Sequence, residues 1–151
     1  MKSALLAATA TLLCLPSALA AQTPEETARA ALEAAPIMDG HNDVPIQLRS
    51  RFSNQITDFD FDDTTDTAEP PRAAMHTDIA RLKQGQVGTQ YWSVYVPASL
   101  DEPEAIQMTI EQIDVTKRLI DRYPEDLQLA TTADPIVAAL EAGKIASLIG
   151  M

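Results

Sequence analysis

His41 and Asp43 are the side chains in this sequence whose types and spacing could do chemistry together. They stand at the polar end of a short segment that starts at Ile37 and reads as a strand, and Asp39 lies two residues before His41. Because side chains alternate along a strand, all three would point to one face if 37–43 is a strand. An imidazole and a carboxylate on one face can bind a cation such as zinc, which accepts both ligand types. Spacing alone leaves open the alternative that His41 is a hydrogen-bonded histidine in a turn after the strand.

The acidic segment 58–69 suggests a second cation site. Its acids occupy positions one, three, five, nine and twelve of a calcium-loop pattern: Asp58, Asp60, Asp62, Asp66 and Glu69. Asp63, however, stands where that loop needs a glycine, and the prolines at 70–71 forbid the helix that should follow. We therefore expect an extended excursion in which Phe59 and Phe61 pack inward and the acids face water. A calcium-binding module is the alternative outside the enzymes.

The remaining polar and aromatic candidates favour structural roles. His76 precedes a helix whose expected cap is Thr77. Ser93 and Ser147 lack the flanking glycines of a nucleophile elbow, so serine catalysis is not expected. Three aromatic residues of the apolar segment 87–96 are expected to pack in the core: Tyr91, Trp92 and Tyr95.

Alternating strands and helices are expected to position these residues. The patterns predict helices over 24–35, 77–84, 101–122 and 136–142, and strands over 37–43, 87–96, 127–130 and 145–149. The segment 44–74 shows no sustained period and is expected to be a long loop. Such alternation predicts parallel strands joined by right-handed crossovers in an α/β fold. The strand at 145–149 reaches the chain end without a following helix, so we expect it to lack a neighbour, as in a truncated domain.

Residues 1–20 have the features of a secretory signal peptide. Lys2 is followed by an apolar stretch and then by small residues before position 21. The only cysteine, Cys14, lies inside this segment, and Leu13 before it argues against lipid attachment. We therefore expect export to the periplasm or outside the cell, and no disulfide in the mature chain.

The charge of the chain excludes some partners. The formal net charge is -11, and removal of the leader takes away one lysine and no acid, which makes it one unit more negative. This sign repels nucleic acid and anionic membranes, so no nucleic-acid partner is expected. It is compatible with metal cations and with small zwitterionic substrates.

Several segments together resemble the membrane (renal) dipeptidase family, the zinc-dependent dipeptidases of peptidase family M19. The matching segments are IMDGHND at 37–43, HTDI at 76–79, VGTQYWSVY at 87–95, EQID at 111–114 and GKIASLIG at 143–150. They occur in the family's order and spacing and cover nearly all of the chain after the leader. In combination they are far more specific than a His-x-Asp motif alone.

The resemblance implies a fold and a partial metal site. The fold would be a (β/α)₈ TIM barrel, of which residues 21–151 supply about the first three strands. His41 and Asp43 would be ligands of the first of two zinc ions, and Asp39 is interpreted as a group that could orient a ligand. A glutamate bridging both metals would follow directly after Met151, with further histidines later. No other catalytic residue is expected within this chain.

The implied reaction is hydrolysis of dipeptides by a metal-bound water in the full-length protein, while the 151-residue chain alone is expected to be inactive. The expected partners are dipeptide substrates and a second copy of the full-length protein in a homodimer. Another metal-dependent amidohydrolase is the alternative within the enzymes.

Overall fold

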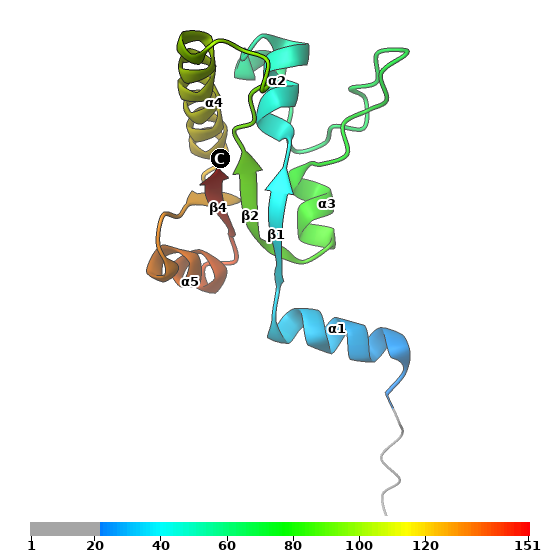
Figure 1. Ribbon diagram of the computed structural model, residues 1–151. Helices are drawn as coiled ribbons and strands as arrows, with labels where there is room; N and C mark the ends of the chain where they lie inside the picture. The colour runs from blue at the N-terminus through cyan, green and yellow to red at the C-terminus, as the bar shows by residue number, and fades with distance from the viewer. Residues whose placement is uncertain (1–21) are drawn as a thin grey trace, which may run out of the picture.

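The computed structural model describes residues 22–151, so the expected signal peptide lies outside the described residues. Helices and strands alternate along the chain (Figure 1): α1 Pro24–Ala34, β1 Ile37–Asn42, α2 Val44–Phe52, the 3-10 turn η1 Ile56–Asp58, α3 Ile79–Gln84, β2 Val87–Ser93, α4 Glu102–Arg122, β3 Leu127–Leu129, α5 Ala133–Glu141 and β4 Ile145–Gly150. Within 22–151 there is no helix both long and apolar enough to span a bilayer.

The strands form one parallel sheet in the order β1-β2-β4-β3, as the predicted α/β alternation requires. All four strands predicted from the patterns are present, and the short strand β3 pairs with the first half of β4. The expectation that 145–149 lacks a neighbour is therefore wrong. The edges of the sheet are β1 and β3, and Ile37 and Met38 on β1 are 42% and 58% exposed.

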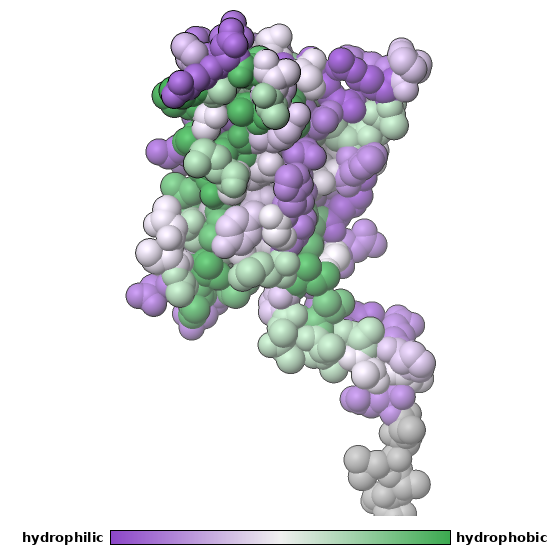
Figure 2. Space-filling model, in the orientation of Figure 1, coloured by the Kyte–Doolittle hydropathy of each residue, from purple (hydrophilic) through white to green (hydrophobic). Residues whose placement is uncertain are grey.

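Hydrophobic side chains divide between the two faces of the sheet. On one face α2, α3 and α4 pack over Trp92 and Ile145 and form the larger cluster. On the other face α5 packs over Ala146 and Leu148, with Tyr91 partly buried against them. The side of the molecule formed by α4 and α5 retains hydrophobic surface, whereas the upper right of Figure 2 is mostly hydrophilic.

The segment 44–74 contains a helix, which corrects the prediction of a loop. Pro45 lies in the first turn of α2, where its missing N–H costs nothing, and Val44 and Leu48 are buried on one face. Pro45 is also buried and Phe52 packs partly against the core, but these few apolar positions do not create a recognisable period in a nine-residue helix. The residues that follow do form an irregular excursion, and Phe59 and Phe61 pack inward as expected.

Two helix starts were predicted from capping residues, with different outcomes. At α1, Thr23 and Glu26 form the predicted capping box. At α3, the cap is Asp78 rather than Thr77, because the Asp78 side chain accepts a hydrogen bond from the backbone N–H of Arg81. The hydroxyl of Thr77 is thereby left for another partner.

Candidate metal centre

The two predicted ligands meet at the carboxyl end of β1. His41 Nε2 lies 3.1 Å from Asp43 Oδ1, and the two side chains are 66% and 55% exposed. Simple alternation along a strand does not produce this contact. Asp43 lies outside the strand, as the residue that precedes α2, and the register between β1 and β2 shifts after Asp39. The side chains converge because a strand irregularity and a helix start occur side by side.

Asp39 occupies a different position from the pair. Its Oδ1 accepts a hydrogen bond from the backbone N–H of His41 at 3.1 Å. The carboxylate thus contacts the backbone of a predicted ligand, and its role in orienting that ligand stays a prediction. In the part of the chain that is described, no three His, Cys, Asp or Glu side chains gather closely enough to hold a metal ion.

The acids of 58–69 line part of one cavity of about 270 Å³, but within the described residues they form no cluster that could hold a metal ion. All five predicted calcium ligands are exposed, and Asp60 Oδ1 accepts a hydrogen bond from the backbone N–H of Asp62. Asp63, the residue at the glycine position, likewise accepts from the N–H of Thr65. These short-range bonds close local turns. The geometry favours the excursion over the calcium-loop interpretation.

Two cavities border the His41–Asp43 pair. The first, of about 390 Å³, is lined by both residues and by His76, which the sequence did not connect with them. The second, of about 610 Å³, is lined by His41 together with Tyr91 and Tyr95. Both cavities give an incoming molecule access to the imidazole of His41. An imidazole and a carboxylate beside open space have the chemistry and the accessibility that a metal centre needs.

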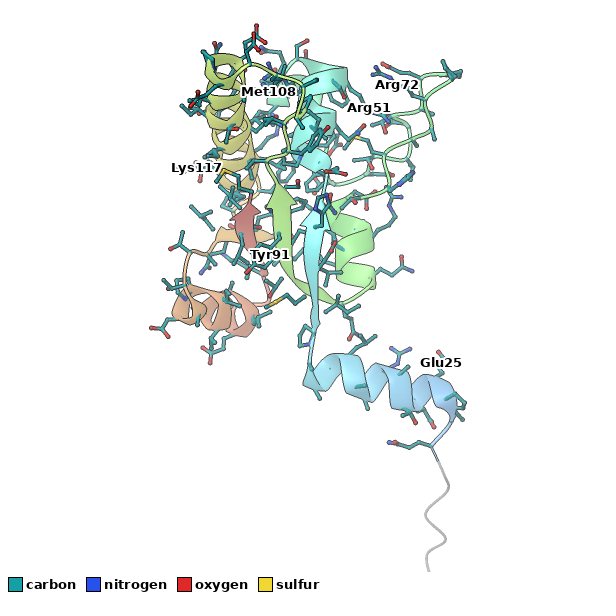
Figure 3. All side chains as sticks on the ribbon, in the orientation of Figure 1. Glu25, Arg51, Arg72, Tyr91, Met108 and Lys117 are labelled. Carbon is teal, nitrogen blue, oxygen red and sulfur yellow. The ribbon has the colours of Figure 1, made fainter. Side chains whose placement is uncertain are left out.

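The aromatic predictions for this region were only partly correct. Trp92 is fully buried, as predicted, because it faces the helices α2, α3 and α4. Tyr95 is 50% exposed, which contradicts the prediction of core packing, because β2 ends at Ser93 and the chain there leaves the sheet. Tyr91, labelled in Figure 3, is intermediate and faces α5.

Two site residues were missed by the sequence analysis. Asn42 donates hydrogen bonds from Nδ2 to Thr77 Oγ1 at 3.1 Å and to Gln90 Oε1 at 3.4 Å. Gln90 is fully buried in the middle of β2. The available signal was a long polar side chain inside an apolar strand, since a buried amide requires partners.

The residues 59–78, which we call the arm, lead from the core to His76 and the first cavity. The arm is held by the buried carboxylate of Asp78, which accepts from the backbone N–H of Thr64 at 3.1 Å and from Arg81 Nε at 2.8 Å. Arg51, labelled in Figure 3, donates from α2 to the carbonyl groups of Thr67 and Ala73, both at 3.0 Å. The arm is therefore fixed from two helices.

The environment of Asp78 has opposing effects on its pKa. Burial by itself raises the pKa of the carboxyl, but hydrogen bonds from the Arg81 side chain and from the N–H groups of Arg81 and Thr64 outweigh burial. The net pKa therefore lies below its usual value. A lowered pKa in the folded state means that the ionised carboxylate stabilises the fold.

We expect Asp78→Asn to lower the free energy of unfolding by about 1–3 kcal/mol at neutral pH, since it leaves buried hydrogen-bonding groups without their partners. The stabilisation by Asp78 is fully present above the unfolded pKa of about 3.9 and is lost as the pH falls through the lower folded pKa. The difference between the two proteins should therefore shrink below about pH 4, as measured by urea unfolding at several pH values. The exposed Asp60→Asn is the control, and an equal loss in both variants would contradict the role of Asp78.

Comparisons with known proteins place the sequence in a family. The family model described as Membrane dipeptidase (Peptidase family M19) matches residues 25–151. Dipeptidase 3 of Mus musculus is 37% identical over 126 residues, which cover 83% of this chain and 23% of that protein. Dipeptidase 3 of Rattus norvegicus is 36% identical with the same coverage. The chain thus spans about a quarter of the length of these relatives.

Solved structures show the same fold. A crystal structure of a metallopeptidase from Rhodobacter sphaeroides, liganded with a phosphinate mimic of the dipeptide L-Ala-D-Ala, has a TM-score of 0.61 at 17% identity. The likeness covers 76% of this chain and 37% of that one. The crystal structure of dipeptidase AC, a metallopeptidase of family M19, has a TM-score of 0.60 at 18% identity and covers 76% and 34%. The resemblance stated from the motifs is confirmed: the chain belongs to the membrane dipeptidase family, peptidase family M19.

Proposed function

We propose that the whole protein hydrolyses dipeptides at a zinc centre in which His41 and Asp43 are ligands of the first of two zinc ions. The observation that carries this proposal is the 3.1 Å approach of the His41 imidazole to the Asp43 carboxylate in a chain of the dipeptidase family. Both side chains are exposed at the carboxyl end of a strand in a parallel sheet, where ligands bind in α/β folds.

The donor set fits zinc in type but is incomplete in number. A neutral imidazole and a carboxylate are common zinc ligands, whereas a catalytic zinc normally has three protein ligands. Within the described residues, no third His, Cys, Asp or Glu side chain joins this pair closely enough to complete a metal site. We therefore propose that further ligands come from parts of the whole protein beyond those described, and that the 151-residue chain alone is inactive.

The chemistry of the proposed site divides between the metal and the chain. When bound, zinc polarises a carbonyl group and lowers the pKa of its bound water to about 7. His41 and Asp43 hold the cation, and neither needs to act as a general base. Asp39 supports the backbone at His41 through its hydrogen bond. The cavities beside His41 leave space for a dipeptide next to the cation.

The test is metal-dependent hydrolysis by the purified whole protein. We expect it to cleave L-Ala-D-Ala, to lose the activity on treatment with 1,10-phenanthroline, and to regain it when zinc is added. Elemental analysis should give two zinc ions for each active protein. Full activity in a zinc-free preparation would refute the proposal, and turnover by the 151-residue chain alone would refute the incomplete ligand set.

The substrate class has one alternative. Another metal-dependent amidohydrolase would use the same ligands for a different amide, so N-acyl amino acids belong in the substrate panel. Cleavage of these compounds without cleavage of any dipeptide would favour that alternative. Homodimer formation and export to the periplasm or outside the cell are also part of the proposal, the second on the pattern of residues 1–20.

A further inference from the structure

The backbone pairing of β1 is interrupted at the predicted ligand. Asp39 pairs with Gln90 and Asn42 pairs with Trp92, so β1 advances by three residues while β2 advances by two. The extra residue makes a bulge at Gly40 and His41. A bulge re-aims a side chain and locally breaks the ladder of backbone hydrogen bonds. The regular sheet therefore does not hold His41 in place, although the metal centre would need it held.

The side chain of Gln90 spans this interruption. Its Nε2 donates to the carbonyl oxygens of Asp39 at 3.5 Å and of Tyr91 at 3.1 Å. Its Oε1 accepts from Asn42 Nδ2 at 3.4 Å. One amide thus contacts β1 before and after the bulge. Gln90 is fully buried, and its strand is paired on both sides, so the amide sits on a rigid support.

Asn42 extends the same network toward Asp43. Its Oδ1 accepts from the backbone N–H of Val44 at 3.2 Å, and its Nδ2 also donates to Thr77 Oγ1 at 3.1 Å. Asn42 is the residue between His41 and Asp43, and the Val44 N–H lies just beyond Asp43. The bonds of this single side chain therefore determine the path of the backbone that carries both predicted ligands.

We propose that Gln90 and Asn42 are positioning residues that set the geometry of His41 and Asp43 for metal binding. This inference rests on the proposed function, because it assigns these residues a role toward the same metal. The two amides bond only to protein groups among the described hydrogen bonds, so their assigned role is toward the ligands and not as ligands. They replace the backbone ladder that the bulge removes, and Thr77 connects the network to the arm.

Loss of such support should weaken the metal site more than the fold. Removing partners that orient metal ligands typically costs about 10–100-fold in metal affinity or activity. Gln90→Met retains an unbranched side chain of similar length but removes all three hydrogen bonds of the amide. Asn42→Ala removes the bonds of the Asn42 side chain to Thr77, Gln90 and the Val44 N–H. We expect the fold to tolerate it better than Gln90→Met, because Asn42 is only partly buried.

The experiment measures zinc in the whole protein. The zinc dissociation constant of each variant is determined by competition with a chromophoric chelator, together with the visible spectrum after cobalt(II) replacement, kcat, KM and the melting temperature. Gln128→Met is the matched control: Gln128 lies on β3 at the opposite edge of the sheet and bonds to the carbonyl of Pro135. We expect both network variants to bind zinc about 10–100-fold more weakly, with an altered cobalt spectrum and a lower kcat, while the control matches the parent protein.

Each outcome decides between this inference and the proposed function. A parent protein that neither binds zinc nor cleaves dipeptides would contradict the proposed function. If the parent is active, folded Gln90→Met and Asn42→Ala with zinc dissociation constants within twofold of the parent would overturn the positioning role. If Gln90→Met does not fold, Asn42→Ala decides alone. Failure of both variants to fold would show that the network serves the fold only and would also overturn the inference.

Discussion

His41→Ala in the whole protein is expected to abolish dipeptide hydrolysis and to remove zinc from the first site. Loss of a residue that merely orients a ligand costs about 10–100-fold, so loss of a ligand itself should lower kcat/KM by more than about 100-fold. The physical reason is that the remaining carboxylate of Asp43 cannot hold the cation with the same geometry. The measurements are kinetics on L-Ala-D-Ala and elemental analysis of the purified variant.

The chain offers a matched control for this substitution. His76 lines the same 390 Å³ cavity as His41 but comes from the arm and has no contact with Asp43 among the described hydrogen bonds. His76→Ala should therefore retain the zinc content of the parent protein. If His41→Ala retained the full zinc content while remaining folded, His41 would not be a ligand. Loss of zinc in both variants would show instead that His76 also contributes to the metal site.

Phe61→Ala is expected to lower the free energy of unfolding by about 3–5 kcal/mol, the usual range for removal of a buried aromatic side chain. Phe61 is fully buried, and its ring centroid lies 5.5 Å from that of Phe59, 5.8 Å from that of Trp92 and 6.1 Å from that of Tyr123. The substitution would leave a cavity at the junction of the arm, β2 and α4. The quantity is measured by urea unfolding of the whole protein.

Phe61→Leu tests whether the stability depends on the buried volume of the side chain or on its aromatic ring. It keeps most of the side-chain volume and should cost less than about half of the loss caused by alanine. Equal losses for leucine and alanine would indicate that the aromatic geometry dominates. A loss below about 1 kcal/mol for alanine would contradict the inward packing of the arm. Calcium should not restore either variant, because Phe61 acts through the core and the described acids of 58–69 form no cluster that could hold a metal ion.

Much of the fold was predictable because its periodicities are local. The apolar run at β2, the long amphipathic helix α4 and the capping residues of α1 each contain their own signal. The helix α2 was missed because its few buried residues, Val44, Pro45 and Leu48, do not create a recognisable period. The pairing of β3 with β4 was also missed, since a three-residue strand gains its partner only in the assembled sheet.

The order of residues by itself determined which side chains were available for metal chemistry. His41 and Asp43 are two residues apart at the polar end of the segment 37–43, and any fold that forms this segment as a strand places them near its end. The family motifs added the expectation of zinc and dipeptides. These conclusions depend on residue types and short separations, which do not change when the chain folds.

Only the tertiary structure decided how these side chains are held. The bulge after Asp39 depends on the register between β1 and β2, and the bond from Asn42 to Gln90 joins residues 48 positions apart. His76 of the arm lines the cavity, and the arm is held there by the hydrogen bond from the backbone N–H of Thr64 to the Asp78 carboxylate. Register and long-range hydrogen bonds arise when distant segments pack together, so no local pattern in the sequence could reveal them.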